Sequence, residues 1–89
     1  MAFEYDPIKS QLNKAKHRID FDEAQALWQD ENGIEVQAKS TTEPRHLRVA
    51  MLNNKLWSAF FTIRDNNIRI ISVRRTRDNE EDLYYGANG

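Results

Sequence analysis

Five arginines gather between residues 64 and 77, in a segment with an apolar, β-branched centre and one acidic side chain, Asp65. A guanidinium group binds phosphate through parallel hydrogen bonds from a planar fork. Buried β-branched neighbours in a strand would hold several such forks in fixed positions. The segment therefore predicts a surface that contacts nucleic acid.

The net charge of the whole chain hides this signal, because 13 Lys and Arg side chains are balanced by 14 Asp and Glu side chains. Residues 1–44 carry 5 basic and 9 acidic groups, residues 45–77 carry 8 and 1, and residues 78–89 carry 4 acidic groups only. A basic face can concentrate a polyanion locally even on a nearly neutral protein. The alternative is that neighbouring strands expose their basic residues to solvent or to the acidic ends of the chain.

Lys16 and His17, at the end of a predicted helix, are the second candidates for chemistry. Histidine can exchange a proton near neutral pH, and lysine can neutralise charge that develops on a phosphate. Cations at a helix C-terminus are also favoured by the helix dipole alone. His46, beside Arg45 at the start of a strand, is interpreted as an exposed strand residue.

Trp57 could stack on an unpaired base or pack in the core, whereas Trp28 belongs to an apolar helical stripe and is assigned to the core. The chain has no cysteine, and two histidines alone cannot form a structural zinc site. Glycine-rich phosphate loops and Gly-x-Ser-x-Gly elbows are missing too. We expect no metal or other cofactor. These residues are still compatible with metal-independent RNA cleavage, in which the adjacent 2′-hydroxyl attacks phosphorus with the help of cations and proton-transfer groups.

Two helices are predicted near the N-terminus. The first begins at Asp6 and Pro7, as N-cap and first helical residue, and ends near His17. Its apolar positions recur at the spacing of a core-facing side: Ile8, Leu12 and Ala15. Asp20 and Glu23 form a capping box for the second helix. The apolar face of that helix comprises Phe21, Ala24, Leu27 and Trp28.

Strands are predicted from residue 34 onward, first over residues 34–38 and, after a loop at 39–44, as a three-stranded meander over residues 45–76. Its turns are placed at Asn53–Asn54 and Asn66–Asn67. In this register Arg64 faces Arg69 across the hairpin, and two like charges so placed suggest a shared phosphate. The register also places Phe60, Thr62, Ile71, Val73 and Arg75 on one face and Ser72 and Arg74 on the other.

The predicted fold class is α+β, with two N-terminal helices packed on an antiparallel sheet of about four strands and a possible short helix after residue 78. Residues 1–85 are expected to form one domain and residues 86–89 a flexible tail. The N-terminus lacks the pattern of a signal peptide, and no run approaches the ~18 apolar residues of a membrane helix. We therefore expect a cytoplasmic protein without a membrane partner.

An ordered set of short motifs resembles the BrnT-type toxins of type II toxin-antitoxin systems. The resemblance spans residues 3–85 and is carried by Asp6-Pro7, Lys16-His17, Ile19-x-Phe21-x-Glu23-Ala24, Glu43-x-Arg45, Arg64 and Arg69-Ile-Ile-Ser-x-Arg74-Arg75. It implies a compact RelE-like fold and a ribonuclease activity that arrests translation. It also implies neutralisation by a BrnA-type antitoxin in a hetero-oligomer, which would contact operator DNA only through the antitoxin.

The resemblance and the residue types together give a set of candidate site residues. The catalytic candidates are Arg64, Arg74, Arg75, Lys16 and His17, and the candidates for RNA contact are Arg45, Arg69 and Trp57. The chain has Arg18 where the family commonly has glycine. The nuclease hypothesis requires that the sheet gather these arginines around one phosphodiester. Two alternatives are a catalytically inactive module that binds nucleic acid or antitoxin, and an interaction domain whose basic face binds an acidic peptide.

Overall fold

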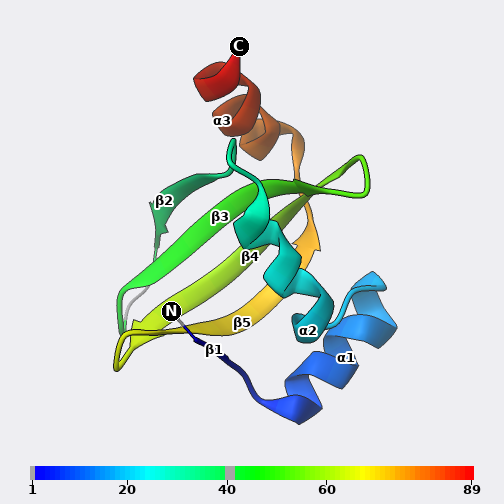
Figure 1. The fold of residues 1–89 in the computed structure, drawn as a ribbon, viewed down its shortest axis with the longest axis vertical. Helices are drawn as coiled ribbons and strands as arrows, with labels where there is room; N and C mark the ends of the chain where they lie inside the picture. The colour runs from blue at the N-terminus through cyan, green and yellow to red at the C-terminus, as the bar shows by residue number, and fades with distance from the viewer. Residues whose placement is uncertain (1, 40–41) are drawn as a thin grey trace.

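A five-stranded sheet with the strand order β1-β5-β4-β3-β2 forms the centre of the computed structural model, which describes residues 2–39 and 42–89 (Figure 1). In chain order the elements are β1 (Phe3–Glu4), α1 (Pro7–His17), α2 (Phe21–Ala24), the 3-10 helix η1 (Gln25–Gln29), β2 (Ile34–Ala38), β3 (Arg45–Leu52), β4 (Lys55–Arg64), β5 (Asn67–Arg75) and α3 (Asp78–Asn88). The α+β class is confirmed. The sheet is mixed rather than antiparallel, because β1 adds a short strand parallel to β5.

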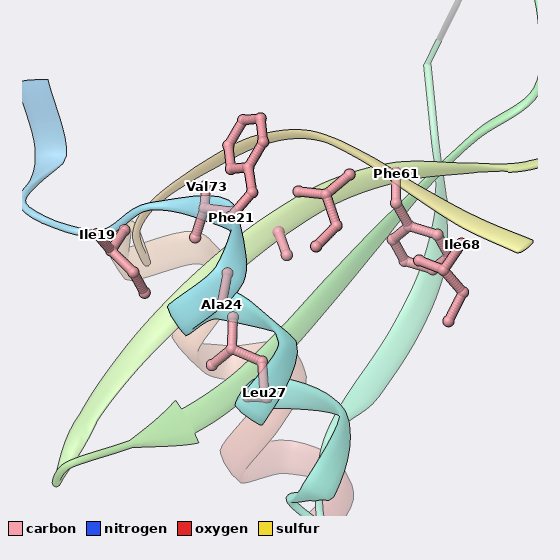
Figure 2. Packing of buried hydrophobic residues seen from close by; sticks show 10 residues of the cluster. Ile19, Phe21, Ala24, Leu27, Phe61, Ile68 and Val73 are labelled. Atoms are coloured by element: carbon pink, nitrogen blue, oxygen red, sulfur yellow. The ribbon is translucent and has the colours of Figure 1, made fainter. Parts of the chain in front are cut away.

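One face of the sheet, here called the front face, is covered by α2 and η1. Figure 2 shows Phe21, Ala24 and Leu27 packed towards Phe61 and Val73 of the sheet. The cap of α2 is as predicted, since Asp20 and Glu23 form a capping box. The predicted second helix is α-helical only as far as Ala24 and continues as a 3-10 helix. Its predicted burial is confirmed for Phe21, Ala24 and Leu27, whereas Trp28 is partly buried.

The opposite face, here called the back face, is covered at one end by α3. Tyr84 of α3 packs with Leu47, Val49 and Leu56 of the sheet. Figure 1 shows α3 at the opposite end of the molecule from the turn that joins β4 to β5. Of the residues 86–89 expected to form a tail, 86–88 belong to α3, and the Asn88 side chain donates to the backbone oxygens of Asn32 and Tyr84. None of the helices in residues 2–39 and 42–89 has the length and apolar character needed to cross a membrane.

The orientation of α1 is the reverse of the prediction. Ile8 and Leu12 are 68% and 64% exposed, while the two buried residues of the helix are polar, Ser10 and Asn13. The Asn13 side chain exchanges hydrogen bonds with the backbone N–H and C=O of Val73 and donates a second bond to the C=O of Ile19. Asn13 thus occupies the edge of β5 just beyond β1. Apolar spacing alone could not predict this, because hydrogen bonds from the Asn13 and Ser10 side chains to the backbone of other segments hold the helix in place.

The turn between β4 and β5 lies one residue earlier than predicted, at Asp65 and Asn66, whose φ angles are 48° and 67°. Asparagine and aspartate are the residues that tolerate such left-handed angles. Arg64 consequently pairs with Asn67, and the expected pairing of Arg64 with Arg69 is wrong.

A bulge between Phe60 and Phe61 shifts the register further along the hairpin. Because Arg74 packs over Phe60 while Arg75 packs over Trp57, the predicted separation of the two neighbouring arginines onto opposite faces is confirmed. The predicted set of side chains that share each face is wrong. Phe60, which pairs with Ser72, shares the back face with Arg74 instead of lying with Val73.

Candidate nucleic-acid interface

The eight candidate residues do not form one cluster. Six lie on the back face or at its border, namely Arg45, Arg64, Arg69, Arg74, Lys16 and His17, whereas Arg75 and Trp57 lie on the front face. The expected grouping of Arg64, Arg74 and Arg75 around one phosphodiester is therefore wrong, so the nuclease arrangement required by the sequence analysis is not found and a nuclease built on this sheet has to contact separate phosphates of one strand. Arg74 and Arg75 are adjacent in a strand, and successive side chains of a strand point to opposite faces. The back face is the surface that brings most candidates together.

Arg45, Thr62 and Arg69 form a row across three strands of the back face. The pairing of His46 with Phe61 places Arg45 beside Thr62, and Thr62 pairs with Arg69. Directly opposed side chains in a sheet are ~4.5–5.5 Å apart at their Cβ atoms. The alternation of β4 keeps Thr62 on the back face, because Phe61 belongs to the front core. The Thr62 hydroxyl therefore lies between the side chains of Arg45 and Arg69.

Two donors in this row lack acceptors. The Nε of Arg45 and the Oγ1 of Thr62 are buried and have no hydrogen-bond partner among residues 2–39 and 42–89, and Thr62 is only 2% exposed. A buried polar group without a partner costs about 1–3 kcal/mol and calls for an explanation, such as a bound ion. Because each atom exposes less than 1 Å² of surface, a phosphate oxygen would reach them only after neighbouring side chains move, whereas Arg69, in the same row, is one-third exposed. The row is therefore a candidate phosphate site.

The arginines at this end of the back face are held loosely. Arg69 lies 3.7 Å from Glu4, and Arg64 lies 3.7 Å from Glu43, with all four side chains at least one-third exposed. Exposed pairs at such separations contribute little to stability. Both guanidinium groups can therefore exchange a carboxylate for a phosphate at low cost.

Arg74, at the other end of the back face, is held tightly. Its Nη1 and Nη2 atoms each donate to a Glu80 oxygen at 2.8 Å, and the two side chains are 16% and 10% exposed. Glu80 also accepts from the Ser58 hydroxyl and from the backbone N–H of Arg77. The bond from Arg74, with those from Arg77 and Ser58, outweighs burial and lowers the pKa of Glu80 from its ordinary 4.5 to about 2.

The bonds to Glu80 leave part of the Arg74 guanidinium unused. Nη1 also donates to the backbone oxygen of Arg75, and the guanidinium lies over the Phe60 ring at 5.2 Å. Of the five N–H donors of an arginine, three are thus engaged. The edge formed by Nε and the second N–H of Nη2 has no hydrogen-bond partner within residues 2–39 and 42–89.

Lys16 and His17 border the back face through a shallow cavity of about 210 Å³. Its walls come from α1 and from Ile71 and Ser72 of β5. Ser72 and Arg74 lie on the same face, two residues and so about 7 Å apart along the strand. The predicted Lys-His pair thus shares a cavity with Ser72, and Arg74 follows two residues later on the same face of β5.

Trp57 lies at a separate cleft on the front face. A cavity of about 400 Å³ is lined by Arg18, Ile19, Glu23, Leu52, Asn53, Lys55 and Trp57. Arg75 packs over the Trp57 ring at 5.4 Å and donates from Nε to the backbone oxygen of Leu56. Arg18 takes a left-handed backbone conformation, with φ 66°, as the C-cap of α1. A glycine would adopt that conformation without strain, so the same turn suits either residue.

Two functional candidates escaped the sequence analysis. Thr62 reads as an ordinary strand residue, and only the register reveals that it lies between Arg45 and Arg69. Glu80 is one of four acids at the start of α3, and nothing in the sequence separates it from Glu81. Arg74 lies in β5 and Glu80 in α3, so no repeat of a single helix or strand relates the two residues.

Together these features define a small α+β protein whose back face offers cationic donors suited to phosphate groups. A family model described as "Ribonuclease toxin, BrnT, of type II toxin-antitoxin system" matches residues 5–80. The chain therefore belongs to the BrnT family of ribonuclease toxins, and a toxin of a type II system has an antitoxin partner. A search of curated proteins gives no match.

Proposed function

We propose that this toxin is a metal-independent endoribonuclease that binds RNA along the back face of its sheet. The supporting observation is the row of Arg45, Thr62 and Arg69, in which buried donors lack acceptors within the described residues. Phosphates are the acceptors that an RNA strand supplies at regular intervals. Arg64, at the end of the same face, adds a further phosphate contact.

The proposed catalytic group is Lys16, His17 and Arg74, which surround Ser72 at the other end of β5. Arg69 and Arg74 are five residues apart, which corresponds to about 15 Å along a strand. One phosphate in the Arg45–Thr62–Arg69 row and the scissile phosphate near Ser72 would thus be separate phosphates of one strand. The row positions the RNA, and the catalytic group acts on it.

The proposed reaction uses the substrate's own 2′-hydroxyl as nucleophile. Its oxygen forms a bond to phosphorus, the bond from phosphorus to the 5′-oxygen breaks, and the products are a 2′,3′-cyclic phosphate and a 5′-hydroxyl. One group accepts the 2′-hydroxyl proton and another donates a proton to the leaving oxygen, and His17 supplies one of these transfers. Lys16 and the free edge of Arg74 stabilise the charge on the pentacoordinate phosphorus.

Arg75 and Trp57 have a separate role in this proposal, because they lie on the front face. Trp57 lines a cleft of about 400 Å³ together with Arg18 and Lys55, and Arg75 packs over the Trp57 ring. Aromatic rings bind unpaired bases by stacking, and nearby cations bind the adjoining phosphates. We assign Arg75 and Trp57 to contact with RNA outside the scissile phosphate.

In the cell, the proposed cleavage arrests translation, and a BrnA-type antitoxin encoded beside the toxin neutralises it. The antitoxin, not this chain, would supply the contacts to operator DNA. This part of the proposal derives from family membership and from the exposed basic groups, which an acidic segment can cover.

RNA cleavage by the purified chain in excess EDTA tests the proposal. We expect product with a 2′,3′-cyclic phosphate end, and loss of at least 100-fold in rate for His17→Ala combined with Lys16→Ala. A circular-dichroism melt of the double variant checks its folding. Cleavage that requires a divalent metal, or full activity of the folded double variant, would overturn the mechanism.

A second candidate function is an inactive RNA-binding module, and the Arg74–Glu80 pair specifically favours it. Three N–H donors of the Arg74 guanidinium bind protein groups, so fewer donors remain to stabilise a transition state. This candidate predicts RNA binding with a steep dependence on salt and no cleavage product. The EDTA assay distinguishes the two functions.

A further inference from the structure

The outward side of α1 carries an apolar stripe that the fold leaves unused. Ile8 and Leu12, one helical turn apart, are 68% and 64% exposed, and Ala15 is also exposed. Scattered exposed apolar residues are normal, but a stripe of them on one helix marks a contact surface. The stripe is the feature of α1 that neither folding nor RNA binding explains.

This orientation of α1 is fixed by its buried side. Ser10 accepts a hydrogen bond from the backbone N–H of Phe21, and Asn13 bonds to Val73 and Ile19. Rotating the helix to bury Ile8 and Leu12 would break these bonds and leave buried backbone groups without partners. The stripe therefore stays outward in the free toxin.

Basic groups border the stripe. The helix contains Lys9, Lys14, Lys16 and no acidic residue. Lys14 pairs with Glu23, on the side towards α2. Lys9 and Lys16 have no ion pair within the described residues and lie on the side towards β5, seven residues and so about 10 Å apart.

A cavity lies where the stripe meets β5. It has a volume of about 210 Å³, with Leu12 and Ile71 as its apolar walls and Lys9 and Lys16 at its rim. Pockets for small molecules span about 300–1,000 Å³. The cavity is therefore more suited to one inserted apolar side chain than to a small-molecule ligand.

We propose that α1 and the adjoining edge of β5 form the docking site for an acidic amphipathic helix of the antitoxin. Its apolar residues would cover Ile8 and Leu12 and fill the cavity, and two acids about two turns apart would pair with Lys9 and Lys16. An RNA strand would use the lysines but leave the aliphatic side chains exposed. The lysines together with the apolar stripe therefore match an acidic amphipathic helix better than they match RNA.

This docking site would also explain how inhibition occurs. Lys16 and His17 line the same cavity, so a helix seated there covers two members of the proposed catalytic group. The inference rests on the antitoxin of the proposed function but not on its ribonuclease chemistry. Antitoxin affinity and RNA cleavage can therefore be measured separately, and either can fail without the other.

The test is the affinity of the full chain for the antitoxin encoded beside it, measured by calorimetry for Leu12→Glu. Loss of one buried leucine and insertion of a charge should weaken binding by on the order of 100-fold. Lys9→Glu should weaken it about fivefold and reduce its dependence on salt. Ile8→Glu, in the same stripe but outside the cavity that Lys16 and His17 line, should also weaken antitoxin binding, while cleavage by this variant of the free toxin should change less than about twofold.

Leu83→Glu is the matched control, because Leu83 is a 38% exposed leucine on α3, far from α1. It should leave antitoxin affinity unchanged, and melting curves show whether each variant folds. Wild-type affinity of folded Leu12→Glu for the antitoxin would overturn the proposal. The proposal is equally wrong if Leu12→Glu abolishes binding to vesicles of anionic phospholipid and leaves antitoxin binding intact, since the stripe would then contact a membrane.

Discussion

The two ends of the back face hold their arginines in opposite ways. At the end covered by α3, Arg74 makes two 2.8 Å bonds to Glu80. At the other end, Arg69 lies 3.7 Å from its carboxylate partner, and Arg45 keeps a buried Nε without a partner among the described residues. At the covered end the Glu80 carboxylate and three of the five Arg74 donors are therefore paired within the fold, whereas the open end keeps buried donors without a partner among the described residues.

This difference separates stability from ligand binding. A group whose partners lie within the fold stabilises the fold and loses stability when a partner is removed. A buried donor that lacks an acceptor destabilises the free protein and gains when a ligand supplies one. The covered end should therefore control the position of α3, and the open end should control RNA affinity.

The largest effect is expected at the open end, where Arg45→Ala combined with Arg69→Ala removes two phosphate contacts. Each bond to a charged group is worth about 1.5–3 kcal/mol, so RNA affinity should fall at least 100-fold. The slope of log affinity against log salt should decrease by roughly 1.4, at ~0.7 for each contact with a single strand. Fluorescence anisotropy at several salt concentrations measures both quantities.

Arg75→Ala serves as the comparison on the front face, and its effect on RNA affinity should be several-fold smaller than that of the double variant. Both proteins should melt within a few degrees of the wild type, because Arg69 is held only by a 3.7 Å pair, Arg75 is exposed, and the buried Nε of Arg45 has no partner among the described residues to lose. A larger loss of affinity for Arg75→Ala would mean that RNA binds chiefly to the front face.

The next effect is expected at the covered end, from Glu80→Gln. The pKa of Glu80 is lowered from 4.5 to about 2 in the fold, so its ionised form stabilises the protein above pH 4.5. That contribution, roughly 3 kcal/mol, is lost as the pH falls from 4.5 towards 2. Urea unfolding should show the loss in the wild type.

Glu80→Gln should lack this loss and should be less stable by about 2–3 kcal/mol at neutral pH. Glu81→Gln, the neighbouring acid on α3, is the control and should behave as the wild type does. If Glu80→Gln instead reduced RNA affinity as strongly as the open-end variant, the separation of the two ends would be wrong.

Local signals in the sequence predicted the elements well. Asp6 caps α1, Asp20 and Glu23 cap α2, and Asn53 and Asn54 form the β3–β4 turn with positive φ angles. Each of these features depends on neighbours within a few residues. The resemblance to BrnT toxins, confirmed by the family match, depends likewise on short ordered motifs.

The sequence analysis was wrong where an element depends on hydrogen bonds to backbone that is distant in the sequence. β1 has two residues, too few for a pattern, and exists because Phe3 and Glu4 pair with Ile68 and Arg69. The apolar spacing of α1 predicted that Ile8 and Leu12 are buried. Asn13 instead binds the edge of β5, so these two residues face outward.

The candidate arginines could be named from the sequence but not grouped. A shift of the turn by one residue, with the bulge near Phe60, changed which side chains share a face.

The smallest effect is expected from Tyr84→Phe, which tests how firmly α3 closes its end of the back face. The Tyr84 hydroxyl donates to Asp30 at 2.8 Å, and burial, followed by this bond, raises the pKa of Tyr84 to about 12. Because the folded state holds this proton more tightly than the unfolded state, stability should decline as the pH rises from 10 to 12. The variant should lose about 1 kcal/mol at neutral pH and should lack that alkaline decline, as measured by urea unfolding. The RNA affinity of the variant should stay unchanged, because α3 leaves the row of Arg45 and Arg69 uncovered. A loss of RNA affinity alongside the loss of stability would show that the two ends of the back face act as one surface.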